Sequence, residues 1–198
     1  MQAANKRHVR VLVVDQSPTD AELVLNELRD AGMQVAAHRV DSEEGLAISL
    51  RDFAPDVVLT EHCLPQIDFR TALGVVQRVR PHTPVIVVVG GWLKEEDTGS
   101  CVRAGAETVL SKQNLTRLAP AISAALDARA AMEKLTPRQI EVMKLVASGF
   151  RTRDIAERLK LSVKTVESHR QEVMRRLGLR NMADLVRYTV RVGLVGET

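Results

Sequence analysis

Short apolar runs alternate with segments of helical period through the first 126 residues. The runs are rich in β-branched residues and are apolar at consecutive positions, as expected of strands buried on both faces of a parallel sheet. We predict five strands, at residues 9–14, 35–40, 56–60, 85–89 and 108–110. Their alternation with helices predicts an α/β domain with a doubly wound, five-stranded parallel sheet and a polar site at the carboxyl ends of the strands.

Helix start and stop signals lie between these strands. Ser17-Pro18 starts a helix that ends at Gly32, Ser42 starts a second, and Asn114 starts the last helix of this domain. Serine, asparagine and an early proline favour helix starts because they satisfy or dispense with the free N–H groups there.

The pattern becomes purely helical after residue 126. The alanine-rich segment 127–134 predicts a partly helical linker, and residues 135–198 predict an all-α domain of four helices. We expect these helices within 136–148, 152–159, 162–177 and 181–192, three of them ending at Gly149, Gly178 and Gly193. Glycine is favoured after a helix because it adopts the left-handed conformation without strain.

The second and third of these helices are joined by only Lys160-Leu161. Two short helices joined so tightly are typical of a helix-turn-helix, whose second helix enters the major groove of DNA. Val166, Val173 and Leu177 form the apolar stripe of that second helix. Its outer faces carry the candidate DNA-binding residues Lys164, Thr165, Glu167, Ser168, Arg170, Gln171 and Arg175.

The charge is divided between the two halves. The 198-residue chain has a formal net charge of +3, but residues 1–130 carry 14 basic and 17 acidic side chains, net −3. Residues 131–198 carry 14 and 8, net +6. A basic module beside an acidic one indicates that the second half binds a polyanion.

Composition excludes several classes of protein. Aromatic residues make up 3% of the chain, too few for the stacking platforms of single-strand and RNA readers. Two cysteines form neither a disulfide framework nor a thiolate zinc site. The apolar run at 11–14 is too short for a signal peptide or membrane span. We expect a cytoplasmic protein with no cofactor, no metal and no membrane partner.

Residues 135–194 resemble the LuxR-type DNA-binding domain. The matching motifs, in order, are LTPRQIEV, DIAERL, TVESH, RLG and RNMADLVRY. The resemblance implies binding to double-stranded DNA, with Glu167, Ser168 and Gln171 facing the bases and with Lys164, Arg170 and Arg175 at phosphates. Glutamine pairs with adenine and glutamate accepts from cytosine, whereas the basic residues supply salt-dependent affinity. The alternative is that these side chains form only a solvated helix face.

The last helix has more apolar residues than one bundle face requires. The resemblance implies that family members dimerise through this helix, and the candidate interface residues are Leu185, Tyr188, Thr189 and Val192. Ordinary core packing is the alternative. His169 is expected to pack against the helix bundle, because no second metal ligand lies at helical spacing.

Residues 8–126 resemble the receiver domain of response regulators. The matching segments are VLVVDQSPTDAELV, PDVVLTEHCLPQID, TPVIVVVGG and AGAETVLSK. A receiver followed by a LuxR-type module is the architecture of the NarL/FixJ family. The resemblance therefore implies a flavodoxin-like receiver that controls a transcription regulator.

The chemistry of the receiver site departs from the family pattern. A working receiver uses paired carboxylates and a phosphorylatable aspartate to hold Mg²⁺ and a phosphoryl group, together with a hydroxyl and a lysine. An aromatic residue on the fifth strand transmits the switch, and Val109 stands at its position. The corresponding pocket here consists of Asp15, Gln16, Glu61, Val89 and Lys112.

These departures predict a receiver that is not controlled by aspartyl phosphorylation. Glu61 is one methylene longer than aspartate, which displaces the attacking oxygen by on the order of an ångström. Val89 cannot donate a hydrogen bond to a phosphoryl oxygen. Two hypotheses remain for the pocket: an ion pair of Glu61 with Lys112 imitates the phosphorylated state, or the pocket is inert. A small molecule, a partner on the face of the fourth and fifth helices, or oxidation of Cys63 are other candidate signals.

The sequence thus predicts a non-enzymatic, phosphorylation-independent transcription regulator that acts as a homodimer on double-stranded DNA and contacts RNA polymerase. One rival is a conventional response regulator in which Glu61 or Asp68 accepts phosphate. The other is a protein-binding adaptor whose basic module does not read DNA.

Overall fold

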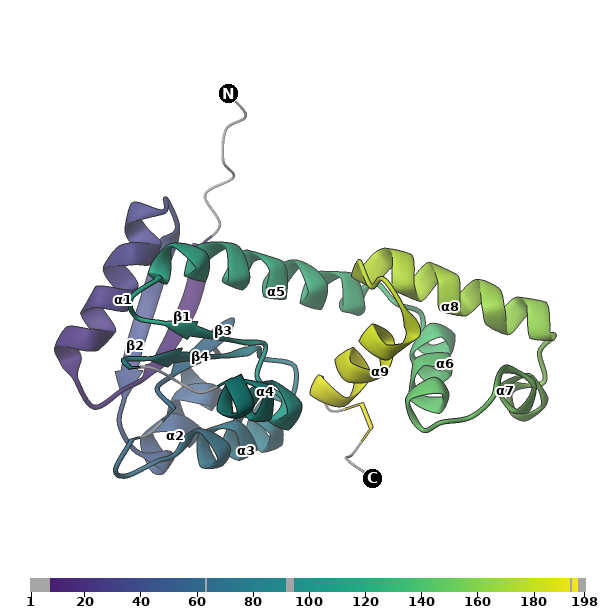
Figure 1. Cartoon of the computed structure of the whole chain (residues 1–198), viewed down its shortest axis with the longest axis horizontal. Coiled ribbons are helices and arrows are strands. Elements are labelled where there is room, and N and C mark those ends of the chain that lie inside the picture. The colour runs from purple at the N-terminus through teal and green to yellow at the C-terminus, as the bar shows by residue number, and fades with distance from the viewer. Residues whose placement is uncertain (1–7, 63, 92–94, 193, 196–198) are drawn as a thin grey trace. The chain divides into compact units, whose positions relative to one another are not determined.

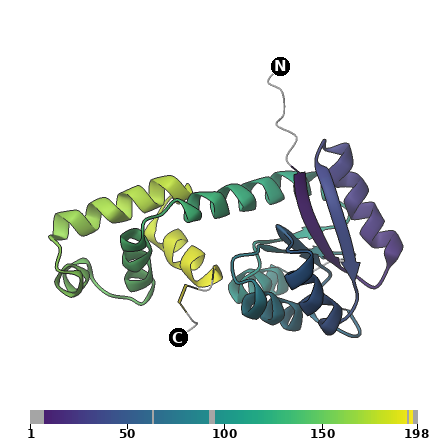
Figure 2. The same ribbon diagram turned by 180° about the vertical axis from the view of Figure 1, so that it is seen from behind.

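The computed structural model describes residues 8–62, 64–91, 95–192 and 194–195, drawn in colour in Figure 1 and from behind in Figure 2. Cys63, the candidate redox sensor, lies outside the described residues. The chain divides into two compact units, Met1–Leu126 and Asp127–Thr198, and each is described by itself.

The first unit is built on one parallel sheet in the order β2-β1-β3-β4-β5. The pairing of Val14 with Thr60 and of Val89 with Ser111 brings the carboxyl ends of the strands to one edge. The strands are β1 His8–Val14, β2 Gln34–Val40, β3 Val57–Thr60, β4 Val85–Val89 and β5 Thr108–Ser111. The prediction of a doubly wound, five-stranded parallel sheet is confirmed.

Helices cover both faces of this sheet. They are α1 Pro18–Asp30, α2 Glu43–Asp52, α3 Phe69–Val79, α4 Glu95–Ala104, the 3₁₀ turn η1 Leu115–Arg117, and α5 Leu118–Glu133. Helices α2, α3 and α4 lie on one face, and α1 and α5 lie on the other (Figures 1 and 2). Leu12 and Val14 pack into the core on the face covered by α2, α3 and α4. Val11 and Val13 pack into the core on the face covered by α1 and α5. Burial on both faces explains the consecutive apolar positions of β1.

The first helices begin where the sequence predicts. The Oγ atoms of Ser17 and Ser42 accept hydrogen bonds from the backbone N–H groups of Asp20 and Gly45, at 3.1 and 3.2 Å. Asn114 behaves differently, because its side chain accepts from the Thr116 hydroxyl and makes no cap bond. The segment after Asn114 therefore begins as a 3₁₀ turn, and the α-helix starts only at Leu118.

Helix α5 crosses the boundary between the two units. Its last residues are helical as far as Glu133, so most of the predicted linker 127–134 is helix. Met132 and Leu135 are buried in the core of the second unit, and the Tyr188 hydroxyl donates to the backbone oxygen of Ala128 at 3.2 Å. The segment before residue 135 therefore contributes to the fold of the helical unit.

Four further helices complete the second unit, in agreement with the predicted all-α domain. They are α6 Pro137–Ala147, α7 Thr152–Leu159, α8 Val163–Leu177 and α9 Met182–Arg191. Thr136, Ser162 and Asn181 cap three of them, each accepting a backbone N–H three residues on. The core includes Met143, Ile155, Val166, Val173 and Leu185, all 0% exposed. Within the described part of the chain, no helix combines the length and apolar character needed to span a bilayer.

Candidate functional site

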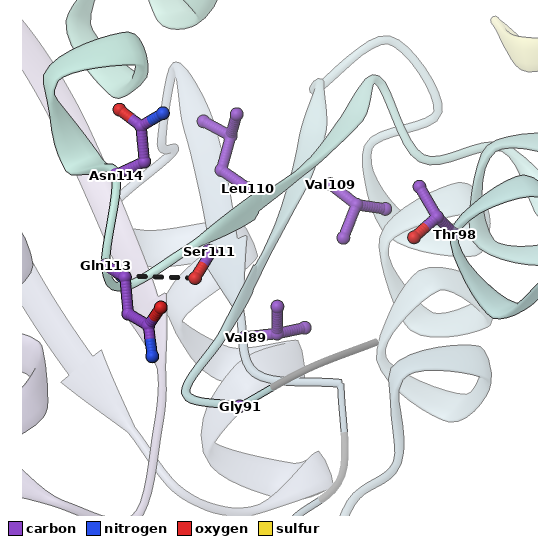
Figure 3. A pocket seen from close by; sticks show the side chains of 8 residues that line it. All are labelled: Val89, Gly91, Thr98, Val109, Leu110, Ser111, Gln113 and Asn114. Carbon is purple, nitrogen blue, oxygen red and sulfur yellow. Dashed lines mark hydrogen bonds between the residues drawn. The ribbon is translucent and has the colours of Figure 1, made fainter. Parts of the chain in front are cut away.

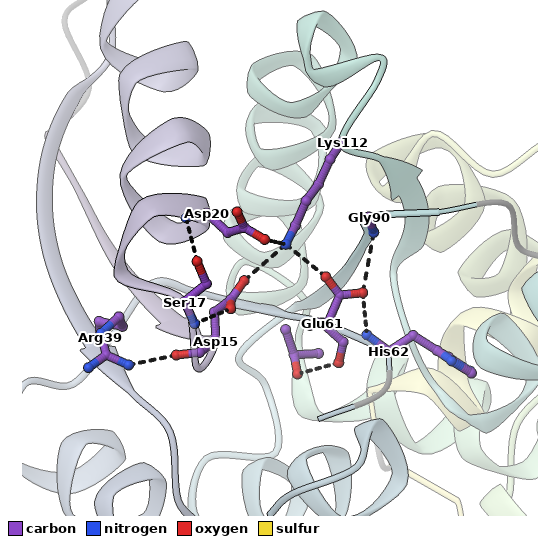
Figure 4. Close-up of polar contacts among 9 residues, drawn as sticks. Asp15, Ser17, Asp20, Arg39, Glu61, His62, Gly90 and Lys112 are labelled. Carbon is purple, nitrogen blue, oxygen red and sulfur yellow. Dashed lines mark hydrogen bonds and ion pairs between the residues drawn. The ribbon is translucent and has the colours of Figure 1, made fainter. Parts of the chain in front are cut away.

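Four strands of the sheet end around one polar pocket, shown in Figure 4. Asp15 directly follows β1, Glu61 follows β3, Gly90 follows β4, and Lys112 follows β5. Because these strands are neighbours in the sheet, residues as far apart in sequence as Asp15 and Lys112 meet at its edge. The pocket lies at the carboxyl ends of the strands, where an open α/β sheet places its functional site.

Three carboxylates converge on the ammonium group of Lys112. Its Nζ atom lies 2.6 Å from Asp20 Oδ2, 2.8 Å from Glu61 Oε2 and 3.2 Å from Asp15 Oδ2. The side chains of Lys112, Asp15 and Glu61 are 11%, 8% and 17% exposed, whereas that of Asp20 is 46% exposed. The pocket therefore contains a mostly buried cation with an excess of negative charge around it.

The outward oxygens of the pocket carboxylates are also bonded. Asp15 Oδ1 accepts from the backbone N–H of Ser17 at 2.8 Å. Glu61 Oε1 accepts from the N–H groups of His62 at 3.2 Å and Gly90 at 3.4 Å. These bonds fix both carboxylates with one oxygen turned toward Lys112, as Figure 4 shows.

Electrostatics favours the charged forms of Lys112 and Asp20. Burial lowers the pKa of Lys112, but its hydrogen bonds with Asp20 and Glu61 outweigh burial and raise the pKa above its ordinary value. The hydrogen bond from Lys112 lowers the pKa of Asp20. Lys112 and Asp20 are therefore both charged at neutral pH.

Asp20 is the pocket residue that sequence reasoning missed. It lies in the first turn of α1, inside the receiver-like segment 11–24 but outside the predicted pocket residues, and its backbone N–H donates to the Ser17 Oγ atom. Gln16, at the position of the lost carboxylate, is half-buried. The only sequence signal was the placement of an acidic residue one turn into a helix that starts at the pocket.

Two valines stand where the family pattern has switch residues. Val89 at the end of β4 and Val109 in β5 line a pocket of about 380 Å³, shown in Figure 3. Its walls combine apolar and uncharged polar side chains, from Val89, Gly91, Thr98, Val109, Leu110, Ser111, Gln113 and Asn114. Neither valine brings a hydroxyl or an aromatic ring to this region.

Asp68, the second candidate phosphate acceptor, has a different role. Its Oδ1 accepts from the backbone N–H of Thr71 at 2.7 Å and caps α3. This hydrogen bond lowers the pKa of Asp68. The carboxylates that pair with Lys112 do not include Asp68.

The candidate DNA-reading surface lies on α8. Ser162 caps this helix, and Lys160 makes the turn before it in the left-handed conformation, with φ 52°. Val166, Val173 and Leu177 are buried, so the opposite face is exposed. That face carries Lys164, Glu167, Ser168, Gln171 and Arg175.

Three predicted DNA-binding residues already have partners within the unit. The Arg170 guanidinium donates to the Thr152 hydroxyl at 2.7 Å and links α8 to α7. Arg175 donates two hydrogen bonds to Glu172, at 2.9 and 2.7 Å. Thr165 shares a hydrogen bond of 2.8 Å with the Ser162 hydroxyl at the cap. Lys164, Glu167, Ser168 and Gln171 are exposed.

The predicted dimer residues are mostly inside the unit. Leu185 and Thr189 are 0% exposed and Tyr188 is 4% exposed, and the Thr189 hydroxyl donates to the backbone oxygen of Leu185. Val192 is half-buried against the same core. The side chains of Leu185, Tyr188 and Thr189 thus complete the core of the helical unit, and their part in a dimer interface stays a prediction.

Comparison with known proteins agrees with both units. Residues 11–123 match the family model "Response regulator receiver domain", and residues 133–189 match "Bacterial regulatory proteins, luxR family". The chain is 26% identical over 211 residues to the transcriptional regulatory protein MctR of Rhizobium johnstonii, covering 96% of each.

Solved structures of RcsB share the fold. One, from Salmonella enterica serovar Typhimurium, is bound to promoter rprA with the phosphomimetic BeF₃⁻; it has a TM-score of 0.50 and 24% identity, and covers 90% of this chain and 98% of that one. Another contains two RcsB dimers bound to two parallel DNAs, with a TM-score of 0.52 and 23% identity, covering 92% of this chain and 98% of that one.

Proposed function

Because this chain belongs to the response regulators, with a receiver domain followed by a LuxR-type domain, we propose that it regulates transcription on double-stranded DNA without control by aspartyl phosphorylation. The Glu61–Lys112 ion pair of 2.8 Å carries the second part of this proposal. Glu61, at the phosphoacceptor position, has a longer side chain than aspartate. Its carboxylate already binds Lys112, the lysine that a phosphoryl group would need. Val89 provides no hydroxyl for that group.

Exposed polar residues on α8 support the DNA-binding part. Glu167, Ser168 and Gln171 supply acceptors and donors suited to base edges, and Lys164 supplies a charge for phosphate. The net charge of +6 on residues 131–198 supports attraction to a polyanion. Arg170 and Arg175 would each have to give up, or share, a bond within the unit to reach a phosphate.

Intact-mass measurement tests phosphorylation. The full-length chain is incubated with acetyl phosphate and Mg²⁺, and we expect no added phosphate on the wild type. The Glu61→Asp variant, which restores the usual acceptor, is the matched comparison. A phosphate added to Glu61 or Asp68 of the wild type would contradict the proposal and favour a conventional response regulator.

DNA titration at several salt concentrations tests the DNA interface. Lys164→Ala should weaken binding to all sequences alike and reduce the salt slope by about one. Gln171→Ala should instead relax base preference, at a cost of about 1–3 kcal/mol at one position. A wild-type chain with neither salt slope nor preferred sequence would favour the protein-binding adaptor.

Genome-wide occupancy separates the two hypotheses for the pocket. If the ion pair imitates the phosphorylated state, Glu61→Ala should lose occupancy that the wild type has. If the pocket is inert, occupancy by Glu61→Ala and Glu61→Asp should match that of the wild type.

The proposal includes a homodimer, as expected for a protein that reads two half-sites. The partly exposed apolar residues of α9 include Val186 and Val190, and an interface on this helix would use them, since Leu185 and Tyr188 are buried. Sedimentation of Val190→Glu, compared with the wild type, tests this interface. Action in the cytoplasm, contact with RNA polymerase and the lack of enzymatic activity remain predictions.

A further inference from the structure

The pocket around Lys112 has the acidic composition of a divalent-cation site, but a lysine fills it. Asp15, Asp20 and Glu61 come from three different elements, and each directs an oxygen at the same point (Figure 4). That point is the Lys112 Nζ atom. The three carboxylates and the ammonium group leave a formal charge of −2 in a largely buried space.

A magnesium ion does not fit this arrangement. Mg²⁺ needs oxygen ligands at about 2.0–2.1 Å in octahedral geometry and keeps several waters. Here the inward oxygens bind Lys112, and the outward oxygens of Asp15 and Glu61 accept backbone N–H groups. Among the described residues as they stand, with Lys112 at the centre of the cluster, no group of three His, Cys, Asp or Glu side chains could hold a metal ion.

Asp20 explains how the lysine is retained. It makes the shortest contact with Nζ, 2.6 Å, although it is not among the predicted pocket residues. Its position in the first turn of α1 lets it reach Lys112, whereas Gln16, next to Asp15 in sequence, brings no charge. Asp20 thus supplies a second carboxylate besides that of Asp15, and this carboxylate binds the Lys112 ammonium group.

We propose that Lys112 is the resident cation of the receiver pocket, held by Asp15, Asp20 and Glu61 in place of a divalent metal ion. Wild-type receiver therefore binds no Mg²⁺ at millimolar concentrations. This inference rests on the proposed phosphorylation-independent function, because it names the interaction that closes the same pocket.

Isothermal titration of the full-length chain with MgCl₂ and MnCl₂ tests the proposal. Wild type should show no saturable binding up to about 10 mM metal. Lys112→Met removes the ammonium but keeps an unbranched apolar stem only one atom shorter, and it should bind both ions at least about tenfold more tightly than wild type. Lys112→Arg should show no saturable metal binding. The double variant Lys112→Met, Asp20→Asn should lose most of the metal affinity that Lys112→Met gains.

A matched control and a second arm keep the test decisive. Lys144→Met replaces an exposed lysine of α6 and should bind no more metal than the wild type. Saturable Mg²⁺ binding by the wild type would overturn the proposal even if Lys112→Met does not fold. A folded Lys112→Met that binds no metal would also overturn it.

The two proposals fail separately. Phosphate transfer to a wild type that binds no Mg²⁺ would contradict only the proposed function. Mg²⁺ binding without phosphate transfer would contradict only the lysine assignment.

Discussion

Lys160 ends α7 in the left-handed conformation, with φ 52° and ψ 46°. A residue with a side chain is strained there by roughly 1–2 kcal/mol, and glycine is not. Glycine also gains entropy in the unfolded chain, which offsets part of this relief. We therefore expect Lys160→Gly to raise the free energy of unfolding by about 0.5 kcal/mol.

Urea unfolding of the full-length chain, followed by helical circular dichroism, measures this change. Lys144→Gly is the control, because Lys144 lies within α6, where glycine costs about 1 kcal/mol. A loss of stability in Lys160→Gly equal to that in Lys144→Gly would show that the turn is not strained.

The ion pair of Asp20 with Lys112 makes the stability of the receiver unit depend on pH. Its pKa is lowered by the Lys112 hydrogen bond from an ordinary value of 3.8. A carboxyl group with a lowered folded pKa contributes stability above its unfolded pKa, and this contribution is lost as pH falls through the folded value. Asp20→Asn should therefore lower the melting temperature at pH 7 and flatten its fall below about pH 4.

Thermal melts between neutral and acidic pH measure this effect. Asp30→Asn, an exposed carboxylate at the other end of α1, is the control. Identical acid dependence in wild type and Asp20→Asn would mean that the Asp20–Lys112 pair adds no stability in solution.

At the scale of elements, β4 and β5 leave space where the family pattern places an aromatic ring. Val109 lines the pocket of about 380 Å³ beside Val89, whereas Val87 on β4 is 0% exposed. Val109→Phe should change the free energy of unfolding by less than about 1 kcal/mol, because the ring can enter open space. Val87→Phe should cost about 1–3 kcal/mol through overpacking. Urea unfolding of both variants checks this difference, and an equal loss would refute it.

Elements also show how far the sequence can predict a site. Lys112 follows a predicted strand, so its place at the carboxyl edge could be read from the pattern. Helical period predicts only the direction in which a side chain leaves its helix, and it therefore predicts that Arg170 lies on an outer face of α8. Its bond with Thr152 depends on how α7 packs against α8, which period does not encode.

At the scale of the whole molecule, α5 belongs to both units. Met132 packs in the helical core, and Ala128 accepts the Tyr188 hydroxyl. A fragment starting at residue 135 loses both interactions, whereas one starting at residue 127 keeps them. We expect the shorter fragment to be less stable by roughly 2–4 kcal/mol, the sum of one buried apolar side chain and one hydrogen bond.

Urea unfolding of fragments 127–198 and 135–198 measures this difference. Equal stability would place the start of the helical unit at residue 135, as the composition of the chain suggested.

The sequence by itself determined the type and order of the elements, the two modules and their opposite charges. These follow from local signals: runs of apolar residues, helical period, caps and short turns. The tertiary structure decided which distant side chains meet. Asp20 and Lys112 are 92 residues apart and pair only because α1 begins at the edge of the sheet where β5 ends. Leu185 and Tyr188 have the apolar pattern of an interface, and within the chain they pack with residues of α5, α6 and α8 and are 0% and 4% exposed. Both outcomes depend on long-range packing, which a local sequence pattern does not encode.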